Sequence, residues 1–408
     1  MRAGSPWSRC PVDSRSDAVQ EADLICLSHL RWNFVYQRPQ HLMSRFARRR
    51  RVFFVEEPVF DANEPRLGVA HTRSGAVIVV PALPAGLTPE EAAHEQRRLL
   101  DDLLERHEVV EFVCWYYTPM ALAFTRHLRP LVTLYDCMDE LSAFAGAPPD
   151  LRRLELELLE RADLVFTGGQ CLYRAKRLLN AHVYAFPSGV DAHHFQRRRT
   201  MADPADQAAI PRPRLGFYGV IVERMDLDLL ATLASKRPEW HVVLVGPVVK
   251  IDSLALPSAP NLHYLGQRGY DALPAYISGW DVAIIPFALN DATAFISPTK
   301  TLEYLAASKP VVSTPISDVV HPYGDEELVL VAADADGFVE AVEVSLSQSP
   351  KGARRRADGL LARASWDGTF ERMRTLIEAA AEDAVEAPLE RRRAPRRDAL
   401  RYVAGEAG

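Results

Sequence analysis

Short apolar runs alternate with amphipathic helical segments along this chain, and the alternation starts again near the middle. Runs that suit strands cover residues 23–28, 51–55, 77–80, 109–116, 131–135 and 164–167, and then 215–218, 241–245, 263–265, 282–286, 311–313 and 328–331. Helical periodicity covers residues 38–48, 89–106 and 151–161, and then 226–236, 270–278, 299–307 and 335–347. Strands that are apolar on both faces are typical of parallel sheets covered by helices. The pattern therefore predicts an α/β protein of two Rossmann-like, doubly wound domains that face a cleft.

The domain boundaries follow from changes in composition. With 408 residues the chain exceeds one ordinary hydrophobic core, so two domains are expected. We place the first domain at residues 22–200 and the second at 214–365, separated by a linker with several Ala, Asp and Pro residues at 201–213. Residues 366–383 have the period of one more amphipathic helix. Residues 1–21 and 384–408 are polar or charged, which favours a disordered leader and a disordered tail.

Composition excludes several classes of protein. Hydrophobic residues (48%) and charged residues (25%) occur in the proportions of a soluble globular protein, and the net charge of −6 is too small to indicate a nucleic-acid partner. The five cysteines form no C-x-x-C pair and no cluster with histidine, so we expect reduced thiols, a cytoplasmic protein and no metal site. No apolar run reaches the ~18 residues that span a bilayer, and the polar N-terminus lacks the core of a signal peptide.

The segment at residues 297–303 (SPTKTLE) carries the strongest chemical signal. Ser297 suits the N-cap of a helix, and Pro298 suits its first position. The free N–H groups of the next residues and the helix dipole then form an anion site, to which Lys300 adds a full positive charge. Glu303 lies one turn further along the same face. A phosphate-binding site beside a carboxylate that can hold a diol indicates a nucleotide-sugar ligand.

An ordinary capped helix with a surface Lys–Glu pair is the alternative explanation of this segment. A lysine in the first turn opposes the helix dipole, however, and lysine before glutamate is the less favourable order for an ion pair along a helix. We therefore favour a ligand-binding role for Lys300 and Glu303.

Several phrases along the chain resemble a known family when they are taken together. They are residues 32–42 (WNFVYQRPQHL), 135–140 (YDCMDE), 187–191 (PSGVD), 217–219 (FYG) and 297–306 (SPTKTLEYLA). In this order they resemble the bacterial two-domain GT-B glycosyltransferases of the group 1, family-4-like type, and most closely the teichuronic-acid-type transferases of cell-envelope polysaccharide synthesis. The resemblance covers roughly residues 22–380. It implies a GT-B fold in which the helix at 366–383 packs back toward the first domain.

The resemblance assigns the donor site to the second domain. Glu303 would accept the ribose hydroxyls, while Lys300 and the N–H groups at Thr299 and Lys300 would stabilise the leaving diphosphate without a metal ion or a cofactor. The other donor-binding residues expected around this segment are Gly219, Glu223, Arg224, Gly246, Pro247, Ser297 and Pro298. A solvated loop arginine is an equal alternative for Arg224. Phe295 replaces the first of two glutamates that family-4 enzymes commonly carry, so we expect sugar recognition to differ here.

The resemblance assigns the acceptor to the first domain. Asp136 and Asp139 follow a buried strand, where ligands collect in open parallel sheets. One of them would orient or deprotonate the acceptor hydroxyl, and we favour Asp136; Asp139 is alternatively the cap of a following helical turn. Trp32, Arg38 and His41 would contact the acceptor or a phosphate, with His41 alternatively a packing residue.

A cluster of five arginines lies next to the aromatic residues of the 32–36 loop. In the family this end faces the membrane that carries a lipid-linked acceptor, and each basic side chain near anionic lipid contributes about 1 kcal/mol. We therefore expect peripheral contact with the inner face of the cell membrane through Arg45, Arg48, Arg49, Arg50 and Arg51. A solvated helix end is the alternative.

Together these features predict a glycosyltransferase that moves a sugar from a nucleotide-sugar, most simply UDP-linked, to a hydroxyl of a cell-envelope glycan or lipid-linked acceptor. The family implies retention of configuration, and closure of the domains would exclude water. One alternative is a nucleotide-sugar epimerase of GT-B fold, which Phe295 disfavours because epimerisation needs carboxylates facing the sugar. The other is a non-catalytic protein that binds a glycan or a nucleotide.

Overall fold

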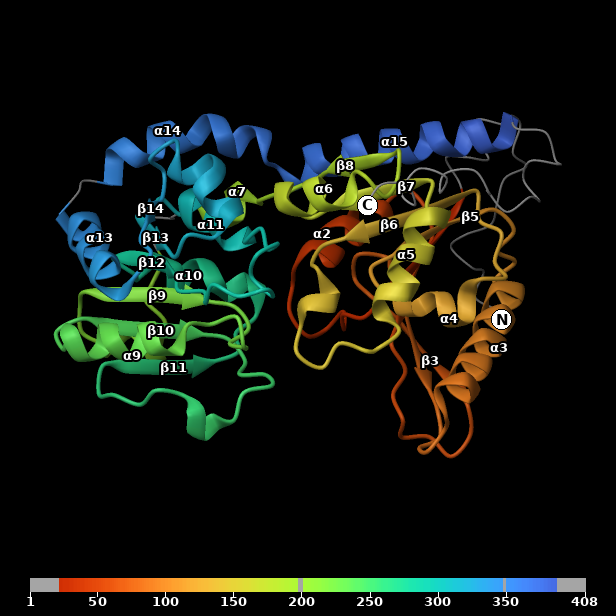
Figure 1. The fold of residues 1–408 in the computed structure, drawn as a ribbon, viewed down its shortest axis with the longest axis horizontal. Helices are drawn as coiled ribbons and strands as arrows, with labels where there is room; N and C mark the ends of the chain where they lie inside the picture. The colour runs from red at the N-terminus through yellow and green to blue at the C-terminus, as the bar shows by residue number, and fades with distance from the viewer. Residues whose placement is uncertain (1–21, 197–200, 348–349, 387–408) are drawn as a thin grey trace, which may run out of the picture.

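A computed structural model of the chain describes residues 22–196, 201–347 and 350–386, which form two α/β domains lying side by side (Figure 1). Each domain is built on a parallel sheet, so the expected architecture of two doubly wound domains is confirmed. The leader predicted at residues 1–21 lies outside the described residues, as does the predicted tail from residue 387 onward. Residues 384–386 continue the last helix instead of starting that tail.

The sheet of the first domain is buried on both faces. Its strands are β1 (Asp23–Ser28), β2 (Val52–Glu56), β3 (Arg66–His71), β4 (Val77–Ala82), β5 (Phe112–Tyr116), β6 (Val132–Cys137), β7 (Leu164–Thr167) and β8 (Val183–Ala185). They are ordered β3–β4–β2–β1–β5–β6–β7–β8, with β3 antiparallel to β4 and the other neighbours parallel. Leu24 and Cys26 of β1 enter one core, and Ile25 and Leu27 enter the core on the opposite face.

Helices cover both faces of this sheet. They are α2 (Arg38–Phe46), α3 (Pro89–Arg106), α4 (Leu122–Thr125), α5 (Leu151–Arg161) and α6 (Gln170–Lys176). Short α7 (Ala192–Phe195) packs instead on the second domain, where Phe195 is buried in the core. Phe46 of α2 lies in the same core as Leu24, whereas Leu103 of α3 and Leu158 of α5 lie in the core on the other face. The i, i+3, i+4 spacing of leucines in α3 and α5 is what directs one side of each helix inward.

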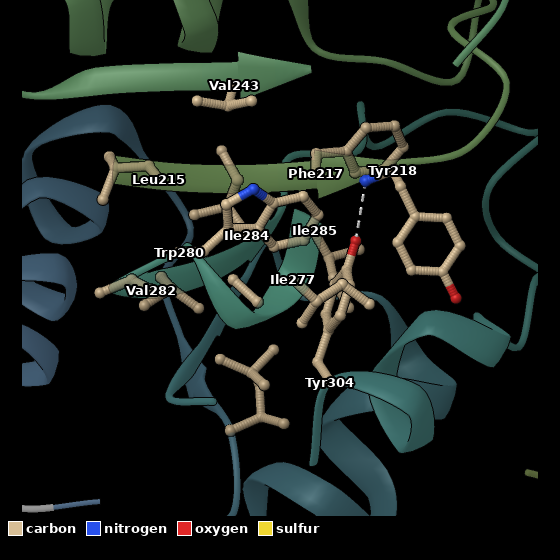
Figure 2. Packing of buried hydrophobic residues seen from close by; sticks show 14 of the residues in the cluster. Leu215, Phe217, Tyr218, Val243, Ile277, Trp280, Val282, Ile284, Ile285 and Tyr304 are labelled. Carbon is tan, nitrogen blue, oxygen red and sulfur yellow. Dashed lines mark hydrogen bonds between the residues drawn. The ribbon is translucent and has the colours of Figure 1, made fainter. Parts of the chain in front are cut away.

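The second domain repeats the plan with a smaller sheet. Its strands are β9 (Arg214–Tyr218), β10 (His241–Val245), β11 (Leu262–Gly266), β12 (Val282–Ile285), β13 (Val311–Ser313) and β14 (Leu330–Val331), ordered β11–β10–β9–β12–β13–β14. Its helices are α8 (Ala205–Ala208), α9 (Leu227–Lys236), α10 (Leu273–Ser278), α11 (Thr299–Ala306), α12 (Ser317–Val319), α13 (Ala335–Ser347) and α14 (Pro350–Arg363). Figure 2 shows Trp280 lying against β9, where Gly216 makes room because a Cβ atom there would overlap the indole ring.

The stretch expected to be a linker, residues 201–213, is packed against the second domain. Gln207 of α8 is fully buried, accepts a hydrogen bond from Trp280 Nε1 at 2.9 Å and donates one to the Tyr276 carbonyl oxygen at 3.0 Å. The polar composition of residues 201–213 gave no sign of this packing. A buried amide is tolerated wherever its hydrogen bonds are satisfied, so a polar segment can still be part of a core. The second domain therefore includes residues before 214.

The two passages of chain between the domains lie next to each other. The N–H of Val190, on the outward passage, donates to the carbonyl oxygen of Ala364 on the return passage at 2.7 Å. The last helix, α15 (Trp366–Glu386), then runs over the first domain, where Trp366 and Phe370 are buried in its core (Figure 1). The C-terminal helix thus ties the return passage to the first sheet.

The arginine cluster at residues 45–51 is occupied by contacts within the protein. Arg45 pairs with Asp367 at 2.7 Å and Arg49 with Glu371 at 3.5 Å, both on α15. Buried Arg50 lies 3.9 Å from Glu378 of the same helix, and Arg51 bonds Asp23 through two nitrogens. Among the five, Arg48 and Arg49 are exposed. Three of the five arginines, Arg45, Arg49 and Arg50, therefore hold α15, and the expected membrane contact through this cluster stays a prediction. No helix in the described residues is long and apolar enough to cross a membrane.

The regular elements that were not anticipated are the strands β3 and β8, the short helices α4, α6, α7, α8 and α12, and the helix α14. The side chains of β3 are mostly exposed, so it has no apolar run, and β8 is a short strand at the sheet edge. Because prediction from apolar runs depends on burial of both faces, edge strands escape it.

Candidate active site

The segment at residues 297–303 forms a loop and a helix start at the carboxyl end of the second sheet. The helix begins at Thr299, as its periodicity predicts, but its N-cap lies one residue later than expected. Pro298 has an extended ψ of 116° and is the N-cap of α11, so Ser297 lies outside the helix and is not its cap. Ser297 instead faces the first domain, where its Cβ would lie 2.8 Å from a Cβ atom placed on Gly169. The first amides of α11, at Thr299 and Lys300, have no acceptor within the helix, as at any helix start.

Lys300 lies over aromatic rings at the end of β9. Its Nζ is 5.4 Å from the ring centre of Phe217, 5.9 Å from that of Tyr218 and 5.7 Å from that of Phe287. Desolvation, followed by repulsion from Arg224, lowers the pKa of the Lys300 ammonium to about 8. Among the residues that the structure describes, no carboxylate forms an ion pair with this half-buried cation, which is unfavourable unless an anion joins it and therefore suits a phosphate ligand.

Two glycines provide the space around this lysine. Gly219 follows β9 with φ 137°, and a Cβ atom on it would overlap Cε of Lys300 and lie 2.8 Å from Nζ. Gly246 follows β10 with φ 156°, and a Cβ atom on it would overlap the carbonyl oxygen of Gly219. Pro247 accepts a hydrogen bond from the N–H of Ile221 at 2.9 Å, which joins the two turns. The predicted donor residues Gly219, Gly246 and Pro247 thus lie together.

Glu303 is buried and is paired with a tyrosine of the same domain. Its side chain is 6% exposed, and the Tyr218 hydroxyl donates a hydrogen bond to its Oε2. Burial raises the pKa of the Glu303 carboxyl to about 8, so the free protein holds it largely protonated at neutral pH. Figure 2 shows the next contact of this network, in which the Tyr218 N–H donates to the Tyr304 hydroxyl at 3.0 Å. Glu303 therefore has one oxygen committed to Tyr218 before any ligand binds.

Arg224 and Asp139 meet across the two domains. The guanidinium of Arg224 lies 3.7 Å from Oδ1 of Asp139 and 5.4 Å from the ring centre of Phe144, both in the first domain. Arg224 is therefore not the freely solvated loop arginine that was the alternative. Glu223 beside it is half-buried. The charge of Asp139 also favours the charged form of Lys300. Arg224, Asp139 and Lys300 therefore lie close enough to influence one another electrostatically.

Asp136 is a structural residue, which corrects the preferred assignment of the acceptor aspartate. It is fully buried, and its two oxygens accept hydrogen bonds from Arg38 Nε at 2.9 Å and from Arg38 Nη2 at 2.8 Å. Arg38 is itself buried and donates from Nη1 to the Phe186 carbonyl oxygen at 2.7 Å. Neither side chain has a surface for an acceptor, so Asp139 is the aspartate of this loop that faces the second domain.

His41 and Trp32 are also packing residues in this structure. His41 is 4% exposed and stacks on Trp366 with ring centres 4.6 Å apart. Burial, with repulsion from Arg45, lowers the pKa of His41 to about 3, so it stays neutral. Trp32 is half-buried and packs edge-on against Phe54 at 5.1 Å. The assignment of buried Arg38 and His41 to the acceptor is therefore corrected, and His41 fits the packing alternative. The assignment of half-buried Trp32 stays a prediction.

Three residues near the contact between the two domains were not predicted from the sequence: His29, Tyr218 and Asp318. His29 directly follows β1, and its Nδ1 is buried without a hydrogen-bond partner among the residues that the structure describes. Burial lowers the pKa of His29, while Asp139 acts in the opposite direction. Tyr218 binds Glu303, and Asp318 reaches the first domain. The signal available for His29 and Tyr218 was their position at the carboxyl end of a central strand.

Acidic side chains do not gather into a metal site in the described part of the chain, where no group of three or more His, Cys, Asp or Glu is placed to hold an ion. Two Asp-x-Asp pairs are present, and both start helices. Asp226 Oδ1 accepts from the Leu229 N–H at 2.8 Å, and Asp334 Oδ1 accepts from the Gly337 N–H at 2.8 Å. These contacts are typical of helix caps.

One family model and one related protein match this chain in sequence. Residues 206–348, which contain Arg224, Lys300 and Glu303, match the family model described as "Glycosyl transferases group 1". A protein of Bacillus subtilis (strain 168), provisionally assigned as the teichuronic acid biosynthesis glycosyltransferase TuaH, is 26% identical over 266 residues. That alignment covers 59% of this chain and 67% of the relative.

Solved structures with the same fold cover nearly the whole chain. Sucrose-phosphate synthase from Thermosynechococcus elongatus matches with a TM-score of 0.67 and 14% identity, covering 89% of this chain and 100% of that one. The catalytic domain of starch synthase IV from Arabidopsis thaliana matches with a TM-score of 0.61 and 10% identity, covering 89% and 99%. The trehalose 6-phosphate synthase from Burkholderia multivorans matches with a TM-score of 0.61 and 12% identity, covering 90% and 100%. At these identities the likeness establishes the fold, which is GT-B.

Proposed function

We propose that this chain, a GT-B glycosyltransferase, moves a sugar from a UDP-linked donor to a hydroxyl of a cell-envelope glycan or lipid-linked acceptor, with retention and without a metal ion. The envelope acceptor is supported by the assignment of the Bacillus subtilis relative to teichuronic acid biosynthesis. An acceptor carried by lipid would place the reaction at the inner face of the cell membrane. Any contact with that membrane would use a surface other than the arginines bound to α15.

The observation that carries the proposal is the convergence of Lys300, Arg224 and the first amides of α11 at the end of β9. A diphosphate leaving group develops negative charge as the bond to the sugar breaks. Two cations and a helix start aimed at that charge stabilise the transition state without any movement of their own. The partly buried setting strengthens each of these interactions relative to water.

Glu303 and Tyr218 would bind the ribose. The Glu303 oxygen not bonded to Tyr218 can accept from one ribose hydroxyl, and ionisation of Glu303 on binding would let it accept from both. Asp139 would orient or deprotonate the acceptor hydroxyl from the first domain. In the free protein Asp139 is paired with Arg224, so a diphosphate that attracts Arg224 would also release Asp139 for the acceptor.

A calorimetric and thermal-shift panel of UDP, ADP, GDP and their sugar conjugates tests the proposal. Saturation at ~100 times the dissociation constant should stabilise the protein by about 2.7 kcal/mol. Glu303→Ala and Lys300→Ala should each lose the effect, whereas Lys236→Ala, a control at an exposed site in the same domain, should keep it. If no nucleotide stabilises the wild type, the donor site is wrongly assigned.

Product analysis separates the remaining functions. A transferase releases nucleoside diphosphate from the stabilising nucleotide-sugar when an acceptor is present, and Lys300→Ala should reduce that turnover by orders of magnitude. An epimerase would instead change the sugar while it stays attached to the nucleotide. A non-catalytic binding protein would do neither, and Lys300→Ala would change its affinity alone.

A further inference from the structure

Asp318 joins the second domain to the start of a helix in the first. It lies on α12, just after β13, and is 5% exposed. Its Oδ2 accepts from the N–H of Gln170 at 2.8 Å, and its Oδ1 accepts from the N–H of Cys171 at 3.2 Å. These are the first amides of α6, where a carboxylate is favoured by both the free N–H groups and the helix dipole. The pair of hydrogen bonds therefore favours the closed arrangement of the domains.

The glycines before α6 make this approach possible. A Cβ atom on Gly169 would overlap Oδ2 of Asp318 and lie 2.8 Å from Cβ of Ser297, so only glycine lets the second domain come this close. A Cβ atom on Gly168 would lie 2.6 Å from the carbonyl oxygen of Met138. The same two-residue turn thus touches the second domain on one side and the loop that carries Asp139 on the other.

The other end of α6 is bonded to that loop as well. Nζ of Lys176, the last residue of α6, lies 2.7 Å from Oε2 of Glu140 and 2.8 Å from Oε1 of Glu155. Lys176 is 5% exposed, so these are buried ion pairs whose geometry is tightly determined. Glu140 is the next residue after Asp139. Short α6 therefore connects the interdomain contact at Asp318 with the loop that holds Asp139 opposite Arg224.

We propose that Asp318 is a positioning residue: by binding the start of α6 when the domains close, it holds the 138–140 loop so that Asp139 meets the acceptor. This inference rests on the proposed function of Asp139. The donor residues Lys300, Glu303 and Arg224 all belong to the second domain, so donor binding does not depend on the Asp318 contact. Activation of the acceptor by Asp139 does depend on the Asp318 contact, and it therefore takes place only when the domains are closed.

Binding and turnover in Asp318 variants provide the first test. Asp318→Ala should leave the dissociation constant of UDP within about twofold of wild type. It should reduce turnover of the UDP-sugar identified in the nucleotide panel by about tenfold or more, the worth of hydrogen bonds to a charged group. Asp318→Asn keeps one oxygen that accepts an N–H and should recover much of the turnover. Asp325→Ala, at an exposed aspartate near the end of the same segment, should behave as wild type.

Amide hydrogen exchange provides a test that needs no acceptor. Asp318→Ala should speed exchange at Gln170 and Cys171 and also in residues 138–143. Glu140→Ala, which leaves Lys176 paired with Glu155, should speed exchange in residues 138–143 alone. Gly169→Ala should repeat the Asp318→Ala pattern, and Gly359→Ala, where a Cβ atom meets nothing within 4 Å, is its matched control.

The outcomes distinguish this inference from the proposed function. If Asp318→Ala speeds exchange at Gln170 and Cys171 while the loop and the turnover stay at wild-type values, the positioning role is rejected. Loss of UDP binding in Asp318→Ala would reject it too, because the donor site would then depend on the contact. If wild-type protein does not bind UDP or any other nucleotide, the proposed function fails, and the exchange experiment still decides whether α6 couples the two contacts.

Discussion

Gly219 and Lys300 fit together so closely that a Cβ atom on the glycine would overlap Cε of the lysine and lie 2.8 Å from its Nζ. The turn after β9 has φ 137°, a conformation that residues with a Cβ atom rarely adopt. The backbone after β9 therefore leaves space for Lys300, and a phosphate can approach both the Gly219 backbone and the Lys300 ammonium.

Gly219→Ala should weaken UDP binding more than it weakens folding. The methyl group displaces Lys300, which should reduce the affinity for UDP about tenfold or more, as expected for loss of a charge-assisted contact. The left-handed φ adds about 1–2 kcal/mol of destabilisation. Titration calorimetry and urea unfolding measure the two effects separately.

Gly86→Ala is the matched control for that variant. Gly86 has φ 85°, but a Cβ atom on it meets nothing within 4 Å. It should lose comparable stability and no UDP affinity. Equal affinities for UDP in Gly219→Ala and wild type would mean that the space around Lys300 is irrelevant to the donor.

UDP binding should weaken as the pH rises through about 8, the pKa to which desolvation and repulsion from Arg224 lower Lys300. The diphosphate favours the charged ammonium, so binding raises the pKa of Lys300 and takes up a proton near pH 8. Well above that pH the affinity should fall by up to about tenfold per unit. Calorimetry in buffers with different ionisation enthalpies counts the net protons exchanged, to which any ionisation of Glu303 on binding also contributes. The difference between wild type and Lys300→Arg, which should take up none through this position, isolates the Lys300 proton.

Glu303→Gln should make the protein more stable at alkaline pH even though it harms donor binding. Burial raises the pKa of Glu303 to about 8, above the value of about 4.5 in an unfolded chain. The wild type therefore loses stability as the pH rises from about 4.5 to 8, because only the unfolded chain releases this proton there. Glu303→Gln has no ionisable group at this position, so its free energy of unfolding does not fall for this reason.

The stability difference between Glu303→Gln and wild type should approach zero near pH 4. At pH 9 it should be on the order of 4 kcal/mol in favour of the variant. Urea unfolding at both pH values measures it, with Glu326→Gln as a control at an exposed carboxylate. A difference that does not change with pH would show that Glu303 ionises freely in the folded protein.

Asp136→Asn and Arg38→Met should each destabilise the first domain by about 3–5 kcal/mol, because each leaves the other member of a buried pair uncompensated. The double variant should lose less than the sum, which a double-mutant cycle of unfolding free energies detects. UDP affinity should not change. An Asp136→Asn protein of normal stability that lacks only turnover would restore Asp136 as the acceptor aspartate.

Local sequence pattern was sufficient to predict most strands of the two sheets. The runs at 23–28 and 164–167 coincide with β1 and β7, because strands buried on both faces must be apolar throughout. The helix start at Lys300 was also visible, since capping depends on a few consecutive residues. The cap was wrong by one residue, because Pro298 and not Ser297 is the N-cap.

The roles of polar side chains depended on partners far away in the chain. Asp136 and Asp139 look alike in the sequence, and Arg38, 98 residues earlier, makes one of them structural. Likewise Asp367 and Glu371 of α15 occupy Arg45 and Arg49, which composition alone presented as a basic surface.

The fold class, the number of domains and the helix that presents Lys300 and Glu303 could be predicted from local pattern, because each is set by apolar periodicity or by neighbouring residues. Which charged groups are free to meet a ligand could be seen only in the folded protein. A charge is available when folding brings no partner to it, and that depends on contacts such as Arg38 with Asp136 or Asp318 with Gln170. These contacts join segments whose separation in the chain leaves no local pattern to read.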